Sequence, residues 1–166
     1  MQLATMSRRS RAREVVLQVL FEDDMNPSHS LTASDRFLQQ RLNNDPVLVE
    51  FAASLLAGVR HHRPELDRML AERTQNWSLR RMAVTDRNVL RLGAYEILFT
   101  DIPDRVAINE AVDLARRFGA GQSAHFVNGV LDRFLKEAEQ DPEKAEQELA
   151  GPAETEQEEA AGPDIP

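Results

Sequence analysis

The densest cluster of chemically suggestive residues lies near the start of the chain. Four arginines fall within six positions, at Arg8, Arg9, Arg11 and Arg13. They precede or open a segment whose apolar residues recur with helical spacing. A helix N-terminus carries partial positive charge, so cations there are unfavourable unless anions bind. The cluster therefore predicts a surface for the phosphates of a nucleic acid, with a flexible, solubilising basic terminus as the alternative.

Two phenylalanines offer rings that a partner could contact. On a helical wheel, Phe21 and Leu17 point away from the apolar stripe of the first helix. They predict a protein-partner face, unless the next helix packs over them. Phe126 lies at the edge of the last helix's apolar stripe, beside His125 and near Asn128. Such a ring could stack on an unpaired base or belong to the core.

Signatures of catalysis and of bound cofactors are missing from the sequence. It contains no cysteine, no glycine-rich phosphate loop and no HExxH zinc motif. The adjacent histidines His61 and His62 are expected to be solvated at a helix end. We therefore predict a protein that is not an enzyme and holds no metal or cofactor. No apolar run is long enough for a membrane span, and no signal peptide is recognisable, so a cytoplasmic location is expected.

The net charge of −8 is distributed unevenly along the chain. Residues 137–166 contain eleven acidic residues and one basic residue, whereas 1–136 contain 19 basic and 17 acidic residues. The last segment is also poor in large apolar residues and cannot offset the entropy of ordering. We predict a flexible start at 1–7, a helical nucleic-acid-binding domain at 8–136 and an acidic disordered tail at 137–166.

The elements that position these residues all have helical periodicity, which predicts an all-α fold of seven helices. The first spans about 8–24, the second follows a capping-box spacing at Thr32–Asp35, and the third opens at Asp45–Pro46. The fifth, after Thr85, is apolar nearly all round and should be central, with Gly93 allowing close approach. Its Glu96 needs a buried partner, for which Asn109 or Arg116 could serve. A sixth helix, 106–118, should bury Phe118, and a seventh follows Ser123.

Several of these blocks, read in order, resemble the NusB family of transcription antitermination factors. The resemblance rests on RRSRARE at 8–14, LQVLF at 17–21, LLAGV at 55–59, NVLRLGAYEIL at 88–98, VAINEAVDLA at 106–115 and FVNGVLD at 126–132. The resemblance covers about 8–135 and excludes the acidic tail. It implies a seven-helix bundle of two sub-bundles, with three N-terminal and four C-terminal helices.

The resemblance also implies a function and a set of contact residues. A NusB-like protein would bind boxA RNA together with the small-subunit ribosomal protein NusE and support ribosomal RNA transcription, with other Nus factors and RNA polymerase engaged indirectly. The alternative is a homodimeric interaction protein whose RNA surface is occluded. The residues implied for RNA are Arg8, Arg9, Arg11, Arg13, Gln122, His125, Phe126 and Asn128. Those implied for NusE are Phe21, Leu17 and Asp86. Gln122 stands where an acid can occur, and Phe21 replaces a frequent tyrosine.

Overall fold

The computed structural model describes residues 7–74 and 78–140. Within these ranges the chain forms seven helices and no strands, which confirms the predicted all-α class. The helices are α1 (Arg8–Met25), α2 (Leu31–Arg41), α3 (Pro46–His61), α4 (Arg63–Arg73), α5 (Val84–Phe99), α6 (Asp104–Phe118) and α7 (Ser123–Gln140). None of the helices in the described ranges is long and apolar enough to cross a membrane.

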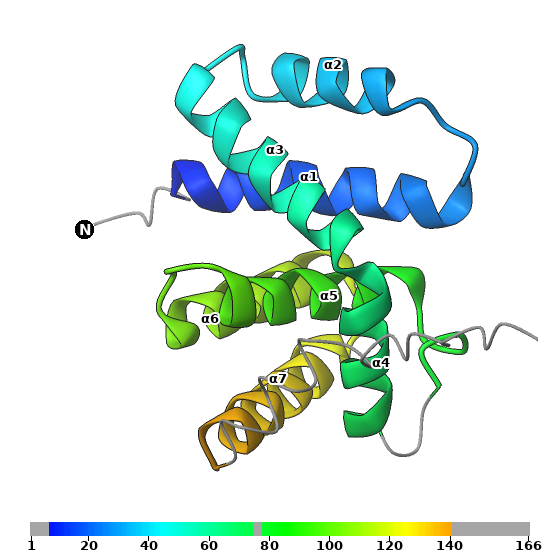
Figure 1. The fold of residues 1–166 in the computed structure, drawn as a ribbon, viewed down its shortest axis with the longest axis vertical. Helices are drawn as coiled ribbons and strands as arrows, with labels where there is room; N and C mark the ends of the chain where they lie inside the picture. The colour runs from blue at the N-terminus through cyan, green and yellow to red at the C-terminus, as the bar shows by residue number, and fades with distance from the viewer. Residues whose placement is uncertain (1–6, 75–77, 141–166) are drawn as a thin grey trace, which may run out of the picture.

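The helices form two layers that meet at α5. Figure 1 shows α1, α2 and α3 in the upper half of the molecule and α5, α6 and α7 in the lower half, with α4 descending from the end of α3. Helix α5 contacts α1 and α3 above it and α4, α6 and α7 in its own half. The prediction that this helix is central is confirmed, because its residues Asn88–Ala94 are buried on every side.

Two glycines allow helices to approach closely around α5. A Cβ added at Gly93 would lie 2.7 Å from a methyl of Leu131 on α7 and 3.2 Å from Ala111 on α6. This contact confirms the role expected for Gly93. A Cβ added at Gly58 on α3 would lie 2.0 Å from the hydroxyl of Tyr95, so this glycine makes room for the tyrosine ring.

Most predicted helix starts are close to the observed ones. Asp45 caps α3 as expected, accepting hydrogen bonds from the backbone N–H groups of Val47 (3.1 Å) and Leu48 (3.2 Å). The capping box expected at Thr32–Asp35 is wrong, because α2 already begins at Leu31 and has no side-chain cap. Ser7 belongs to the segment expected to be flexible, yet its hydroxyl accepts from the backbone N–H of Ser10 (3.0 Å) and caps α1.

The boundary expected at residue 137 lies inside a helix. Helix α7 continues to Gln140, and Glu137 forms ion pairs with Arg73 of α4 (2.8 Å) and Arg133 of α7 (3.1 Å). The ion pair with Arg73 gives the last turn of α7 a partner on α4. The boundary at 137 was predicted from the scarcity of apolar residues, which does not reveal such an ion pair. The rest of the predicted tail, 141–166, lies outside the described residues, as do 1–6 of the predicted flexible start.

A cluster around Asp24 joins the end of α1 to the lower layer. Its carboxylate accepts hydrogen bonds from Arg87 (3.0 Å), Asn88 (2.9 Å) and Arg91 (2.9 Å) of α5, and it also pairs with Arg63. Burial alone would raise the pKa of this carboxyl, but Arg91, Asn88, Arg87 and Arg63 together hold the pKa below its ordinary value. Asn88 and Arg91 of α5 are therefore buried polar residues that anchor the end of α1.

The region of the two adjacent histidines differs from the sequence expectation. The ring of His62 stacks on Phe99 of α5, with centroids 3.9 Å apart, so His62 is not a freely solvated residue. His61 is exposed, as expected. Among the described residues, no group of three or more histidines and carboxylates is arranged to hold a metal ion.

Candidate nucleic-acid interface

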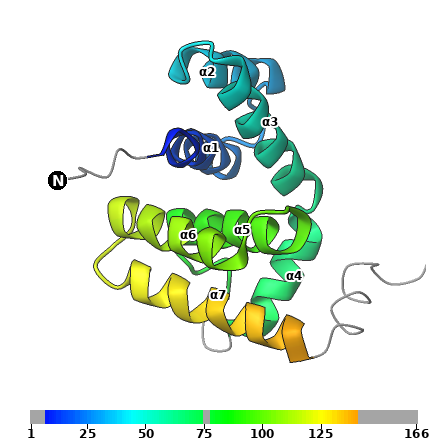
Figure 2. The ribbon, with the colours of Figure 1, turned by 90° about the vertical axis from the view of Figure 1, so that its left-hand side faces the viewer.

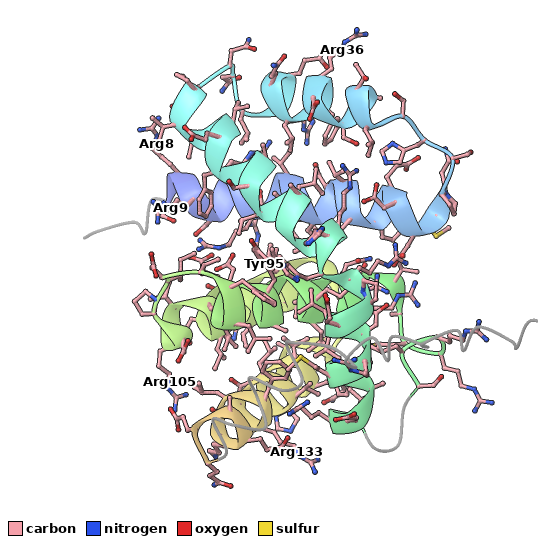
Figure 3. All side chains as sticks on the ribbon, in the orientation of Figure 1. Arg8, Arg9, Arg36, Tyr95, Arg105 and Arg133 are labelled. Atoms are coloured by element: carbon pink, nitrogen blue, oxygen red, sulfur yellow. The ribbon has the colours of Figure 1, made fainter. Side chains whose placement is uncertain are left out.

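The four arginines at the start of α1 have four different surroundings. Arg8 is exposed and pairs with Asp45, the N-cap of α3. Arg9 is exposed, and its guanidinium lies over the ring of Phe51, 4.8 Å from the centroid. Arg11 is half-exposed and pairs with Glu14 (2.9 Å). Figure 3 shows Arg8 and Arg9 projecting at one end of α1. These three can reach an external phosphate.

Arg13 does not belong to the exposed arginine surface. Its side chain is 3% exposed, and its guanidinium donates to both oxygens of Glu96 on α5, at 2.6 and 3.0 Å. Glu110 of α6 lies 3.7 Å away. Arg13 was predicted to contact RNA, but here its guanidinium is held by Glu96, because the position one turn after Arg9 faces α5. Arg13 is also the partner that Glu96 needs, in place of the expected Asn109 or Arg116.

This buried cluster holds two carboxylates against one guanidinium. Burial raises the pKa of the Glu96 carboxyl above its ordinary value, against the lowering effect of Arg13, and the neighbouring Glu110 raises it further. Ser10 donates a hydrogen bond to Glu110 (2.7 Å) and so joins α1 to α6 at the same point. The cluster fixes the end of α1 that carries Arg8, Arg9 and Arg11.

The end of α6 extends the basic surface of α1, which the sequence reasoning missed. Glu14 of α1 is buried and pairs with both Arg11 and Arg117 of α6. Phe118, the last residue of α6, was expected in the core but is 43% exposed. The Arg117 guanidinium lies 5.4 Å from its ring centroid. The sequence feature that could have revealed this part of the surface is the pair Arg116–Arg117 followed by an aromatic residue at the end of a helix. An apolar residue in the last turn can lie beyond the neighbouring helix and so remain exposed.

The start of α7 presents the remaining residues implied for RNA. Gln122, His125 and Asn128 are exposed, and Phe126 is half-buried. Gln122 and Phe126 line a hollow of about 320 Å³, and Asp86 of α5 forms another part of its wall. One oxygen of Asp86 is buried and lacks a hydrogen-bond partner among the described residues. A residue implied for NusE and two implied for RNA thus share one hollow.

The predicted protein-partner face is only partly exposed. Phe21 is 41% exposed, whereas Leu17 is 4% exposed and belongs to the core. The expectation that Leu17 points outward is wrong, because helices pack on two sides of α1 and bury a wider arc than a single stripe. Of the two residues, only Phe21 is available on the surface, and Leu17, one helical turn before it, is buried in the core.

Helix α6 links the two predicted RNA segments. Figure 2 shows it lying between α1 and α7. The contact between Glu14 and Arg117 ties it to the start of α1, and the short segment 119–122 leads from its end to the start of α7. The structure therefore connects Arg11, Phe118 and Gln122 through neighbouring elements.

Comparison with known proteins gives a family for this arrangement. The NusB family model matches residues 10–136. The transcription antitermination protein NusB of Desulfatibacillum aliphaticivorans is 44% identical over 130 residues, covering 76% of this chain and 89% of that protein. The NusB of Myxococcus xanthus is 42% identical over 132 residues, covering 77% and 94%.

Solved structures agree with the sequence relatives. The T. maritima NusB is 37% identical, with a TM-score of 0.70, covering 78% of this chain and 91% of that one. A structure of NusB and NusE in complex with double-stranded RNA contains a chain that is 25% identical, with a TM-score of 0.71, covering 80% and 99%. The sequence and fold together show that this chain belongs to the NusB family.

Proposed function

We propose that this chain is a transcription antitermination factor that binds boxA RNA together with NusE and supports ribosomal RNA transcription. The observation that carries the proposal is that exposed arginines lie at the start of α1, an exposed ring beside an arginine at the end of α6, and a half-buried ring at the start of α7: Arg8, Arg9, Arg117, Phe118 and Phe126. Guanidinium groups neutralise phosphates, while rings stack on unpaired bases. Relatives that carry the name of antitermination protein, and a solved NusB with NusE and RNA, support it.

The proposal extends to the other partners and to the location of the protein. Contact with RNA polymerase and other Nus factors would be indirect, through the assembled RNA and NusE. We expect a cytoplasmic location, since nascent ribosomal RNA of bacteria is made there. Phe21 and Asp86 are proposed as NusE contacts, with Leu17 supporting Phe21 from the core. His125 and Asn128 are proposed as polar RNA contacts beside Phe126.

The phosphate contacts are tested with the variant Arg8→Ala/Arg9→Ala. If each arginine neutralises one phosphate of a single strand, the slope of log affinity against log salt should become shallower by about 1.4. The matched control is Arg36→Ala/Arg41→Ala, which removes two exposed arginines from α2, where Arg36 lies away from α1 (Figure 3). Fluorescence anisotropy of labelled boxA RNA at 50–200 mM salt gives the slopes. Equal slopes for the two variants would refute the phosphate role.

The stacking contacts are tested with Phe118→Ala and Phe126→Ala. Losing one base–ring contact should weaken RNA binding by about 1–3 kcal/mol, with little change in the salt slope because no charge is lost. The half-buried Phe126 needs a folding control, and thermal unfolding supplies it. A folded Phe118→Ala variant with wild-type RNA affinity would remove the end of α6 from the interface.

The protein-partner face is tested with Phe21→Ala. If this ring is a central contact for NusE, its removal should weaken NusE binding by about 2 kcal/mol or more. Val47→Ala, which removes an exposed apolar side chain at the start of α3, is the control. Calorimetric titration with NusE measures both, and anisotropy should show that binding of RNA alone is unchanged. Unaltered NusE affinity for Phe21→Ala would place the contact elsewhere.

A further inference from the structure

A second, larger hollow opens where the two layers meet, next to Arg9. It has a volume of about 440 Å³ and lies between the start of α1, α3, the end of α5 and the start of α6. Phe51, Tyr95, Ile102 and Val106 supply much of its apolar wall. Ser54 and Asp101 also line it, and both are exposed, as is Val106, so the hollow opens to solvent. None of these residues was implicated by the sequence.

Arg9 gives this hollow a cationic rim. It forms no ion pair with any residue in the described ranges, whereas Arg8 is paired with Asp45. One face of its guanidinium is held on the Phe51 ring at 4.8 Å. A guanidinium can stack through its face and donate hydrogen bonds to phosphate through its edges. Arg9 is therefore placed to contact a phosphate and the base attached to the same sugar.

The carboxylates in the wall restrict what can enter the hollow. Asp101 and Glu110 both line it, and Glu110 is already shared with Arg13 and Ser10. Arg13 also lines the hollow, but its guanidinium is paired with Glu96, so Asp101 and Glu110 disfavour a phosphate or an acidic side chain in the interior. They accept hydrogen bonds, however, and a nucleobase edge bears N–H donors. The charge pattern favours a neutral, flat, donor-bearing group inside and an anion at the rim.

We propose that this hollow receives one unstacked nucleobase of a single RNA strand, whose adjoining phosphate lies at Arg9. The inference rests on the proposed function, because it extends the same RNA path beyond the start of α1. Its volume falls within the usual range for small-ligand sites, and Arg13, which also lines it, is held by Glu96. The RNA footprint then reaches the junction of α3, α5 and α6.

The test fills the hollow from its exposed rim. Ser54→Leu adds an apolar side chain into the hollow and leaves every arginine in place. Ala57→Leu is the matched control, since Ala57 is exposed on the same helix and does not line the hollow. We expect Ser54→Leu to bind boxA RNA about tenfold more weakly, within the range for one stacked base, with an unchanged salt slope. Ala57→Leu should bind within about twofold of wild type, since it changes neither charge nor a stacking contact.

A set of RNAs, each lacking one base, identifies the inserted nucleotide. The wild-type protein should bind one of these abasic RNAs more weakly than intact RNA, by about the factor that separates Ser54→Leu from wild type on intact RNA. The Ser54→Leu variant should bind that abasic RNA and intact RNA with nearly equal affinity, because its hollow is already filled. With wild-type protein, 2-aminopurine at that position should change its fluorescence on binding, because the base leaves its stacked neighbours in the strand. If no position responds in the abasic set and none changes its fluorescence, the inference is overturned, whatever the stability of the variant.

The outcomes separate this inference from the proposed function. If Ser54→Leu binds RNA like wild type while Arg8→Ala/Arg9→Ala is weakened, the hollow takes no base and the proposed function stands. If Ser54→Leu weakens NusE binding alone, the hollow is a protein contact and the inference is overturned. If wild type binds no boxA RNA at 50 mM salt, with or without NusE, the proposed function fails and the inference fails with it.

Discussion

At the scale of single residues, Arg9 and Arg13 differ although they are one helical turn apart. Arg9 lies at the exposed end of α1, while Arg13 is covered by α5 and donates to Glu96. Sequence spacing placed both in one basic cluster, because it records position along the helix and not the presence of a covering helix. The buried carboxylate at Glu96 was recognised as needing a partner, but the partner came from a helix distant in sequence.

The structural role of Arg13 predicts the behaviour of Arg13→Met. Removing the guanidinium leaves Glu96 buried without its partner, so the free energy of unfolding should fall by about 3–5 kcal/mol at pH 7. Arg13→Met/Glu96→Met should recover much of that loss, since an apolar pair of similar size removes both charges. Urea unfolding measures both variants. If Arg13→Met kept full stability and lost RNA affinity, Arg13 would be a phosphate contact after all.

At the scale of helices, the sequence predicted the number and order of the elements well. Helical spacing found α3 and α6 because each has one buried face, and it found α1 through one stripe of its wider buried surface. The N-cap Asp45 marked the start of α3. The predictions failed where a helix is covered from more than one side or ends at the surface. Leu17 is buried by a second neighbour, and Phe118 is exposed because α6 ends there. Both errors concern neighbours, which periodicity alone does not specify.

The cap of α3 also restrains an arginine of the proposed interface. Asp45 both caps α3 and pairs with Arg8. Asp45→Asn should keep the cap, because asparagine caps as well as aspartate, and should free Arg8. We expect little change in stability and an RNA affinity several-fold higher, because Arg8 no longer has to leave Asp45 in order to reach a phosphate. Asp45→Ala should give the same gain in RNA affinity but lose about 0.5–2 kcal/mol of stability. Anisotropy titrations and urea unfolding measure the two effects, and an unchanged RNA affinity in Asp45→Asn would exclude Arg8 from the interface.

At the scale of the whole molecule, the two layers are joined by polar clusters at both ends of α1. Arg13–Glu96 lies near its start and Asp24 with its three arginines near its end. The sequence predicted the two sub-bundles through the family resemblance, but not these clusters, because each joins residues more than 35 positions apart. The position of α1 on α5 and α6 determines how far Arg9, Phe118 and the hollow beside Phe51 lie from one another. The interface therefore depends on how the layers are held together.

This coupling predicts how Asp24→Asn responds to pH. The Asp24 carboxyl has a lower pKa in the folded protein than in the unfolded chain, so its contribution to stability is full above the unfolded value of about 3.9 and is lost as the pH falls through the folded value. At pH 7, Asp24→Asn should lower the free energy of unfolding by about 3–5 kcal/mol, because three arginines lose their shared acceptor. The gap from wild type should persist at pH 5 and narrow towards pH 3.

Urea unfolding at these pH values measures that gap, with Asp35→Asn as the control, since Asp35 is exposed on α2. The control should change stability by little at any pH. A gap for Asp24→Asn that stays constant from pH 7 to pH 3 would show that the carboxylate's charge does not hold α1 to the lower layer. In a folded Asp24→Asn protein, weaker RNA binding with an unchanged salt slope would indicate that α1 has shifted, since Asp24 itself is not proposed to touch RNA.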